Sequence, residues 1–275
     1  MSQHRIAPRR GRPKKPNRDP GDGKSTVLAL DRGLRALLYI ADCDGATLTG
    51  ISKETDIPVA TCHRLLATLG QRGMAKYIEA TGEWEVGPQA YRVGLSYRKN
   101  DNLLQVATPI MQRMSKETGE TSNVAVEDDG ELLYLAQVES DNPVRASIKN
   151  GAGNHFNTSG VGKVIMAFMD QTKLNHLLQS KPLARQTENS ICERSAFIDE
   201  LVLIKRRGWA LDDEERFAGM RCIAGPVFDP SGGIVAGVSI SGPSTRFPDQ
   251  NLSKLADSVT SAAREISDRL KTAAE

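Results

Sequence analysis

The feature that most constrains the fold is a sharp break between two short helical patterns. Asp56-Ile57-Pro58 interrupts a helix, because proline lacks an N–H and restricts the residue before it. One helix is expected to end near Thr55, and Pro58 suits the first turn of another that runs to about Gln71. One face of this later helix should pack on the helices before it, and it carries Cys62, Leu65, Leu66 and Leu69.

Elements on both sides of the break complete a recognisable motif. An earlier helix, ended by Asp44-Gly45, is predicted from helical spacing of Leu30, Leu34, Leu37, Leu38 and Ala41. After Gly73, Ala75–Glu79 and Glu83–Val86 alternate like two short strands around a turn. Three helices followed by a small hairpin are the winged form of the helix-turn-helix.

The outward face of the third helix is the candidate DNA-reading surface. Arg64 is the best candidate for a base contact, because a guanidinium pairs with the two acceptors of guanine. Thr61 and His63 flank it and are candidates for bases or phosphates, and Lys76 on the hairpin is a candidate for phosphate. The alternative is a generic three-helix bundle in which Arg64 is merely solvated.

The charge of the chain is concentrated at its start. Residues 1–24 hold eight Lys or Arg against two Asp, while the rest holds 28 basic and 32 acidic side chains. This segment is rich in Pro and Gly and is expected to be disordered alone. Arg10, Gly11, Arg12 and Pro13 resemble an AT-hook core, which places arginines in a narrow minor groove. The alternative is a solvated basic tail.

The second half reads as an α+β domain with an antiparallel sheet. Asp128-Asp129-Gly130 and the turn 229–233 each separate two strand patterns, as in hairpins. A further strand is expected at Val144–Lys149. Helices are expected at about Leu103–Glu117, Val161–Met169, Lys173–Gln179 and Ser195–Arg207, with a last helix carrying Leu252 to Leu270.

A glycine-rich segment opens one of these helices. The free amides after Ser159, at Gly160 and Val161, together with the helix dipole favour an anion. The segment is not a phosphate-binding Walker loop, because Asn157 and Val164 stand where Gly and Ser/Thr are required. A plain helix cap that needs close packing is the alternative.

Two serines on a later strand are further candidates for ligand contacts. Ser239 and Ser241 alternate with apolar residues, so their hydroxyls share a face, and Gly237 is expected to leave room beside a ligand. The alternative is a half-solvated strand. From residue type alone, Asp212 reads as part of a solvated turn and Cys222 as a small buried residue.

Composition excludes several other classes. No apolar run reaches the roughly 20 residues of a membrane helix, and the basic start lacks the core of a signal peptide, so a cytoplasmic, nucleoid-associated location is expected. The four cysteines form no C-x-x-C pair and suggest reduced thiols. No catalytic set, metal site or cofactor is expected. An enzyme acting on a small acid through Cys222 or Asp212, and an architectural binder of AT-rich DNA, stay open as alternatives.

Several separated motifs in order resemble the IclR family of bacterial regulators. They are the runs Leu30–Leu34, Ile57–Leu66, Thr158–Lys163, Gly225–Asp229 and Val238–Pro243. The match covers about residues 25–272, and the tail is not a general feature of the family. Composition and pattern predict the tail (1–24), a winged helix-turn-helix (25–87) and a linker helix (88–102), and the resemblance implies that residues 103–275 form a GAF-like effector domain.

The resemblance also implies a ligand and partners. It implies a homodimer or homotetramer, a palindromic operator and a small carboxylate effector, with glyoxylate or a related 2-oxo acid as the leading candidate and an aromatic or other acid as the alternative. The matching effector groups are the amides at Gly160 and Val161 and the side chains of Asp212, Cys222, Ser239 and Ser241. Ser159, at the start of the same helix, is a further candidate.

Overall fold

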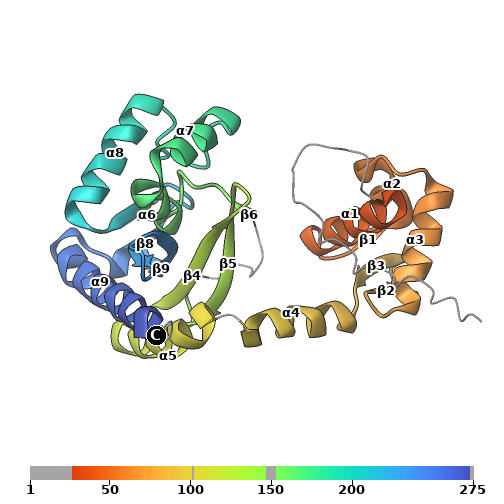
Figure 1. Cartoon of the computed structure of the whole chain (residues 1–275), viewed down its shortest axis with the longest axis horizontal. Helices are drawn as coiled ribbons and strands as arrows, with labels where there is room; N and C mark the ends of the chain where they lie inside the picture. Colours follow the sequence, from red (N-terminus) through yellow and green to blue (C-terminus); the bar gives the residue numbers. More distant parts are fainter. Residues whose placement is uncertain (1–26, 101, 147–152, 273–275) are drawn as a thin grey trace, which may run out of the picture. The chain divides into compact units, whose positions relative to one another are not determined.

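The computed structural model describes residues 27–100, 102–146 and 153–272, which divide into two compact units between Arg92 and Val93 (Figure 1). The basic tail, including Arg10, Gly11, Arg12 and Pro13, lies outside the described residues. Among the described residues, no helix is both long and apolar enough to cross a bilayer.

The first unit is a winged helix-turn-helix. Its elements are α1 (Leu28–Asp42), β1 (Ala46–Thr47), α2 (Leu48–Thr55), α3 (Val59–Gln71), β2 (Ala75–Ile78) and β3 (Glu83–Val86), followed by α4 (Pro88–Asn100). The three strands form an antiparallel sheet in the order β1-β3-β2. Ile40, Ile51, Ile57, Cys62 and Leu66 are buried at the centre of this unit. The predicted packing face of α3 is therefore confirmed.

Helix α1 buries a different face from the one that carries its leucines. Gly33, Ala36 and Ile40 turn inward. The predicted periodic stripe is mostly on the surface, since Leu30, Leu34 and Leu38 are 62%, 48% and 64% exposed. This helix therefore has an apolar face that its own unit leaves uncovered.

The second unit has a six-stranded antiparallel sheet in the order β6-β5-β4-β9-β8-β7. The elements are α5 (Asn102–Thr118), β4 (Thr121–Asp128), β5 (Glu131–Val138), β6 (Gly153–Asn154), α6 (Gly160–Phe168), α7 (Gln171–Ser180), α8 (Arg194–Arg207), β7 (Ala210–Asp213), β8 (Met220–Phe228), β9 (Ile234–Pro243) and α9 (Asp249–Thr272). Helices α5 and α9 pack on one face of the sheet, and α6, backed by α8, packs on the other (Figure 1).

The predicted α+β architecture is confirmed, but the described part of one predicted strand does not form a strand. Both hairpins form as predicted, and the first turns through Asp129 and Gly130, whose φ angles of 47° and 79° suit a two-residue hairpin turn. Val144–Ala146 forms no strand, and the rest of the stretch predicted as Val144–Lys149 lies outside the described residues. The strand at this edge of the sheet is instead Gly153–Asn154, which pairs with β5.

Candidate functional sites

Helix α3 presents a polar, non-acidic face to solvent. His63 and Arg64 are exposed and Thr61 is half-buried, while Cys62 and Leu66 hold the opposite face against the unit's core. No acidic residue occurs in the helix, so its exposed charge is positive. A helix that enters the major groove of DNA needs this distribution of charge.

The turn before α3 is held in place by specific hydrogen bonds. Asp56 adopts the left-handed conformation with φ of 53°, and buried Ile57 follows it. The Ser52 hydroxyl donates to the Ile57 carbonyl at 2.6 Å, and Arg35 donates to the Thr55 carbonyl at 2.6 Å. These bonds fix the direction in which α3 leaves the turn.

The hairpin β2–β3 carries the fourth predicted DNA contact, Lys76. Its side chain is exposed, and Glu85 is its direct partner across the two strands. Such a carboxylate offsets the positive charge of Lys76. The phosphate contact of Lys76 stays a prediction. Lys76 has an acidic residue opposite it, whereas α3, which carries Arg64, contains no acidic residue.

The second unit contains a cavity of about 220 Å³ that gathers several of the predicted ligand residues. Ser159, Asp212, Cys222 and Ser241 line it, from the start of α6 and from β7, β8 and β9 respectively. We call it the polar cavity. Its other lining residues are Tyr134, Arg145, Ala146, Arg216, Phe217, Met220 and Arg221.

The start of α6 offers amide donors beside this cavity. The Ser159 hydroxyl caps the helix by accepting from the amide of Gly162 at 3.3 Å, and it also bonds the Tyr134 hydroxyl at 2.9 Å. The amides of Gly160 and Val161 precede the first intrahelical bonds, so they have no acceptor within the helix. An added Cβ at Gly160 would lie 3.1 Å from the sulfur of Cys222, so the helix start packs directly on β8.

Asp212 is a buried carboxyl at the cavity wall. Its Oδ1 accepts from the amides of Glu215 at 2.8 Å and Arg216 at 3.3 Å. Burial, with the negative charge of Glu215 adding to it, raises the pKa of Asp212 to about 7. Near neutral pH this group is therefore able to donate as well as accept a hydrogen bond.

Lys163 lies on the first turns of α6 and is turned into the protein rather than toward a ligand. Its side chain is 1% exposed and that of Glu215 is 5% exposed, and the Lys163 ammonium pairs with the Glu215 carboxylate and donates to the Leu211 carbonyl. Burial raises the pKa of Glu215, and the Lys163 charge opposes that rise. This pair braces α6 against β7 and the loop after it.

The two predicted serines have different positions. Ser241 lines the cavity and accepts from the Asn123 amide at 3.4 Å. Ser239 is fully buried, does not line the cavity, and its hydroxyl has no hydrogen-bond partner among the described residues. The room expected beside Gly237 is absent, because an added Cβ there would lie 2.7 Å from Val161 of α6.

Cys222 completes this group as a neutral thiol. Burial, with the charge of Asp212 adding to it, raises its pKa to about 11. A thiol held this far from ionisation is the opposite of an activated nucleophile. Cys222 therefore fits a binding role better than a catalytic one.

Sequence reasoning missed the aromatic and cationic part of the cavity. The Arg216 guanidinium lies 5.8 Å from the ring centre of Tyr134 and 5.1 Å from that of Phe217. Arg221 pairs with Asp213 at 2.6 Å and Asp249 at 2.8 Å. These residues come from β5, β8 and the loop after β7, and only the folded sheet brings them together.

Comparisons with known proteins agree with this architecture. A family model for the IclR helix-turn-helix domain matches residues 29–79, and one for the C-terminal domain of bacterial IclR transcriptional regulators matches residues 95–268. The HTH-type transcriptional regulator BhcR of Paracoccus denitrificans is 39% identical over 94% of this chain and 93% of its own. The transcriptional repressor IclR of Escherichia coli is 33% identical over 95% and 96%. A solved transcriptional regulator from Rhodococcus sp. RHA1, 28% identical, superposes with a TM-score of 0.79 over 90% of this chain and 100% of its own.

Proposed function

Because the chain belongs to the IclR family of bacterial transcriptional regulators, we propose that a small carboxylate in the polar cavity controls how it binds operator DNA. The winged helix-turn-helix holds the DNA, and the second unit senses the effector. The effector need only bind one arrangement of the protein better than another, and that difference in affinity limits the response.

One observation carries the proposal: buried polar side chains from separate elements, Ser159, Asp212 and Ser241, line a single cavity. Beside it, the amides of Gly160 and Val161 in the first turn of α6 have no acceptor within the helix. Buried polar groups are normally satisfied, so each of these favours a polar ligand. The volume of about 220 Å³ fits an acid of a few heavy atoms, and we propose glyoxylate or a closely related 2-oxo acid.

The chemistry of the lining assigns a place to each end of such a ligand. Its carboxylate would lie against the α6 amides, at the positive end of the helix dipole, with Arg216 nearby. Its oxo group would accept from Ser241 and from protonated Asp212. Cys222 and the ring of Tyr134 would exclude water from the other sides. No bond to carbon is made or broken in this scheme.

We further propose that two copies bind a palindromic operator as a homodimer or homotetramer. Leu30, Leu34 and Leu38 form an exposed apolar stripe on α1, as a surface that meets a second copy would. Paired copies would present two α3 helices to successive turns of the major groove. Each α3 would use Arg64, with Thr61 and His63 beside it, to contact the DNA.

Calorimetry with the full-length protein tests the effector. Glyoxylate, pyruvate and a panel of other small acids are titrated into the wild type and into a double variant that carries both Ser239→Ala and Ser241→Ala. Saturable binding of one acid, weakened about 100-fold in the variant, supports the site, since a lost hydrogen bond to a charged ligand costs about 1.5–3 kcal/mol. Ser253→Ala, on the exposed face of α9, is the matched control and should bind like the wild type. Wild-type protein that binds none of the acids would refute this effector class.

A DNA measurement tests the other half of the proposal. An operator is selected from random DNA with the full-length protein, and its affinity is measured by fluorescence anisotropy with and without the acid. Arg64→Ala should weaken binding roughly tenfold or more, since a bidentate contact with guanine is worth about 1–3 kcal/mol. Arg269→Ala on α9 removes the same charge from the other unit and should not. Equal loss from both variants would contradict a specific role for Arg64.

A further inference from the structure

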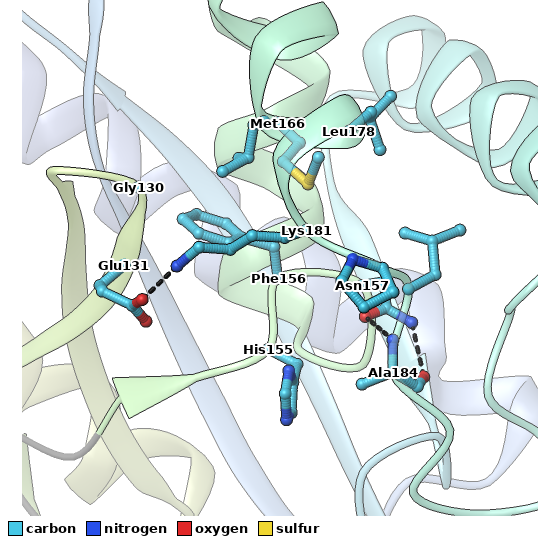
Figure 2. A pocket seen from close by; sticks show the side chains of 12 residues that line it. Gly130, Glu131, His155, Phe156, Asn157, Met166, Leu178, Lys181 and Ala184 are labelled. Carbon is cyan, nitrogen blue, oxygen red and sulfur yellow. Dashed lines mark hydrogen bonds and ion pairs between the residues drawn. The ribbon is translucent and has the colours of Figure 1, made fainter.

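A second cavity of about 330 Å³ lies in the same unit and shares no lining residue with the polar cavity (Figure 2). We call it the apolar cavity. It is bounded by the turn before β5, the segment that leads into α6, α6 itself, α7 and the loop after α7. Its lining residues are Gly130, Glu131, His155, Phe156, Asn157, Met166, Leu177, Leu178, Lys181, Pro182, Leu183 and Ala184.

The inner walls of this cavity are apolar. Phe156, Met166 and Leu177 are buried, and Leu178 and Leu183 are half-buried around them. Figure 2 shows Met166 and Leu178 on the side formed by α6 and α7, with the loop at Ala184 on another side. An occupant therefore gains by removing apolar surface from water rather than by forming many hydrogen bonds.

The buried polar side chain in the lining is already fully bonded. The side-chain amide of Asn157 donates to the carbonyl of Ala184 at 2.8 Å, and its oxygen accepts from the Ala184 amide at 3.0 Å (Figure 2). The same side-chain amide also donates to the carbonyl of Ile191 at 3.1 Å. Asn157 thus fixes the loop that forms one wall. It has no remaining need for a polar ligand.

Charge at the rim is also balanced. Lys181 pairs with Glu131 (Figure 2), and both side chains reach solvent, at 41% and 61% exposure. His155 is exposed at the edge. A carboxylate ligand would have to compete with Glu131 for Lys181. It would also lose its hydration when it entered the apolar cavity, which costs free energy. An uncharged ligand meets neither penalty.

We propose that the apolar cavity is a second ligand site, which takes an uncharged aromatic molecule of one ring or a fused pair of rings. Its volume lies near the lower end of the roughly 300–1,000 Å³ of known ligand pockets, and an apolar cavity of about 150 Å³ holds benzene. The Phe156 ring offers edge-to-face contact and the Met166 sulfur offers a polarisable surface, both of which favour an aromatic ring.

The probe for this site is 5-fluoroindole, followed by ¹⁹F NMR during titration with the full-length protein. We expect a saturable change in the probe's signal with the wild type. Leu178→Glu should weaken binding at least tenfold, because it puts a carboxylate against the ring. Leu178→Trp should weaken it as much by filling the space without adding charge, so a folding defect in one variant leaves the other as a test. Leu203→Glu, on the exposed surface of α8, is the matched control and should bind normally.

Two further comparisons test the assignment. The probe should bind the double variant Ser239→Ala plus Ser241→Ala as well as it binds the wild type, since neither serine lines the apolar cavity. 4-Fluorobenzoate is the charged comparison. Its affinity for the protein should not fall in Leu178→Trp, since a charged ligand is not expected in the apolar cavity. The proposal is wrong if wild-type protein gives no saturable signal, if both Leu178 variants bind normally, or if the double serine variant abolishes binding.

Discussion

The two cavities each have a lysine–glutamate pair beside them, and the pairs differ in burial. Lys163 and Glu215, beside the polar cavity, are 1% and 5% exposed, whereas Lys181 and Glu131, at the apolar cavity, are 41% and 61% exposed. The polar cavity also has the first amides of α6 beside it, which have no acceptor within the helix, while Asn157 in the apolar cavity is fully bonded. Residue types alone therefore do not show which cavity needs a polar ligand, because burial and partners decide it.

The largest expected effect comes from breaking the buried pair. Lys163→Met leaves Glu215 buried without its cation, which typically costs about 3–5 kcal/mol. Lys181→Met removes the same charge from the exposed pair and should change stability by less than about 1 kcal/mol. Urea unfolding of both variants, followed by circular dichroism, measures the difference.

A smaller loss of stability should follow from crowding residues 156–162, the segment that contributes lining residues to both cavities. An added Cβ at Gly162 would lie 2.4 Å from the Phe156 carbonyl oxygen. Gly162→Ala should therefore destabilise the protein by about 1–3 kcal/mol and weaken both ligands. Gly94→Ala in α4 meets nothing within 4 Å and should stabilise it by about 0.5–1 kcal/mol. If Gly162→Ala stabilised the protein as much as Gly94→Ala does, the backbone at Phe156 would have to move aside at little cost in free energy.

The pH dependence of binding separates the cavities further. The pKa of Asp212 is raised to about 7, and a bound anion favours its protonated form. Affinity for glyoxylate should thus be greatest below pH 7 and fall up to tenfold per unit above it, as Asp212 loses its proton. The charged or titratable groups around Asp212 are Lys163 of α6, Glu215 and Arg216 of the following loop, Cys222 of β8 and Tyr134 of β5.

The variant Asp212→Asn is the comparison, because its side-chain amide still donates a hydrogen bond but does not gain or lose a proton in this pH range. Calorimetry from pH 6 to 8.5 should give a flat affinity for this variant and a falling one for the wild type. Binding of 5-fluoroindole should be flat in both proteins. A wild-type affinity for glyoxylate that does not change across this range would contradict proton-linked binding.

The sequence predicted the polar cavity better than the apolar one, for physical reasons. Alternation along a strand predicts which side chains share a face, and the family resemblance selected Asp212, Cys222 and Ser241, which the fold brings together. Alternation does not give depth, so it did not reveal that Ser239 is fully buried and lies outside the cavity lining, whereas Ser241 is part of that lining.

Elements distant in sequence account for what was missed. Tyr134 and Arg216 meet only through the sheet, and the apolar cavity depends on how α7 and its following loop pack against α6. Similarly, helical spacing predicted α1 but not which of its apolar faces would be buried. Tertiary packing made that choice, covering Ala36 and Ile40 and leaving Leu30, Leu34 and Leu38 exposed.

The smallest expected effect is a coupling between the two cavities. Phe156 and Asn157 line one cavity, and Ser159, two residues further on, lines the other and caps α6. A ring against Phe156 should shift the start of α6, and saturating 5-fluoroindole should change the affinity for glyoxylate by about fivefold, the lower end of common couplings. Calorimetry is run in both directions. In Leu178→Trp, where the indole fills the apolar cavity, the probe should not change the affinity for glyoxylate.

Linkage requires glyoxylate to change the affinity for 5-fluoroindole by the same factor. Unequal factors would mean that the two ligands are not reporting one equilibrium, and a factor of one would make the shared segment a rigid wall between independent sites.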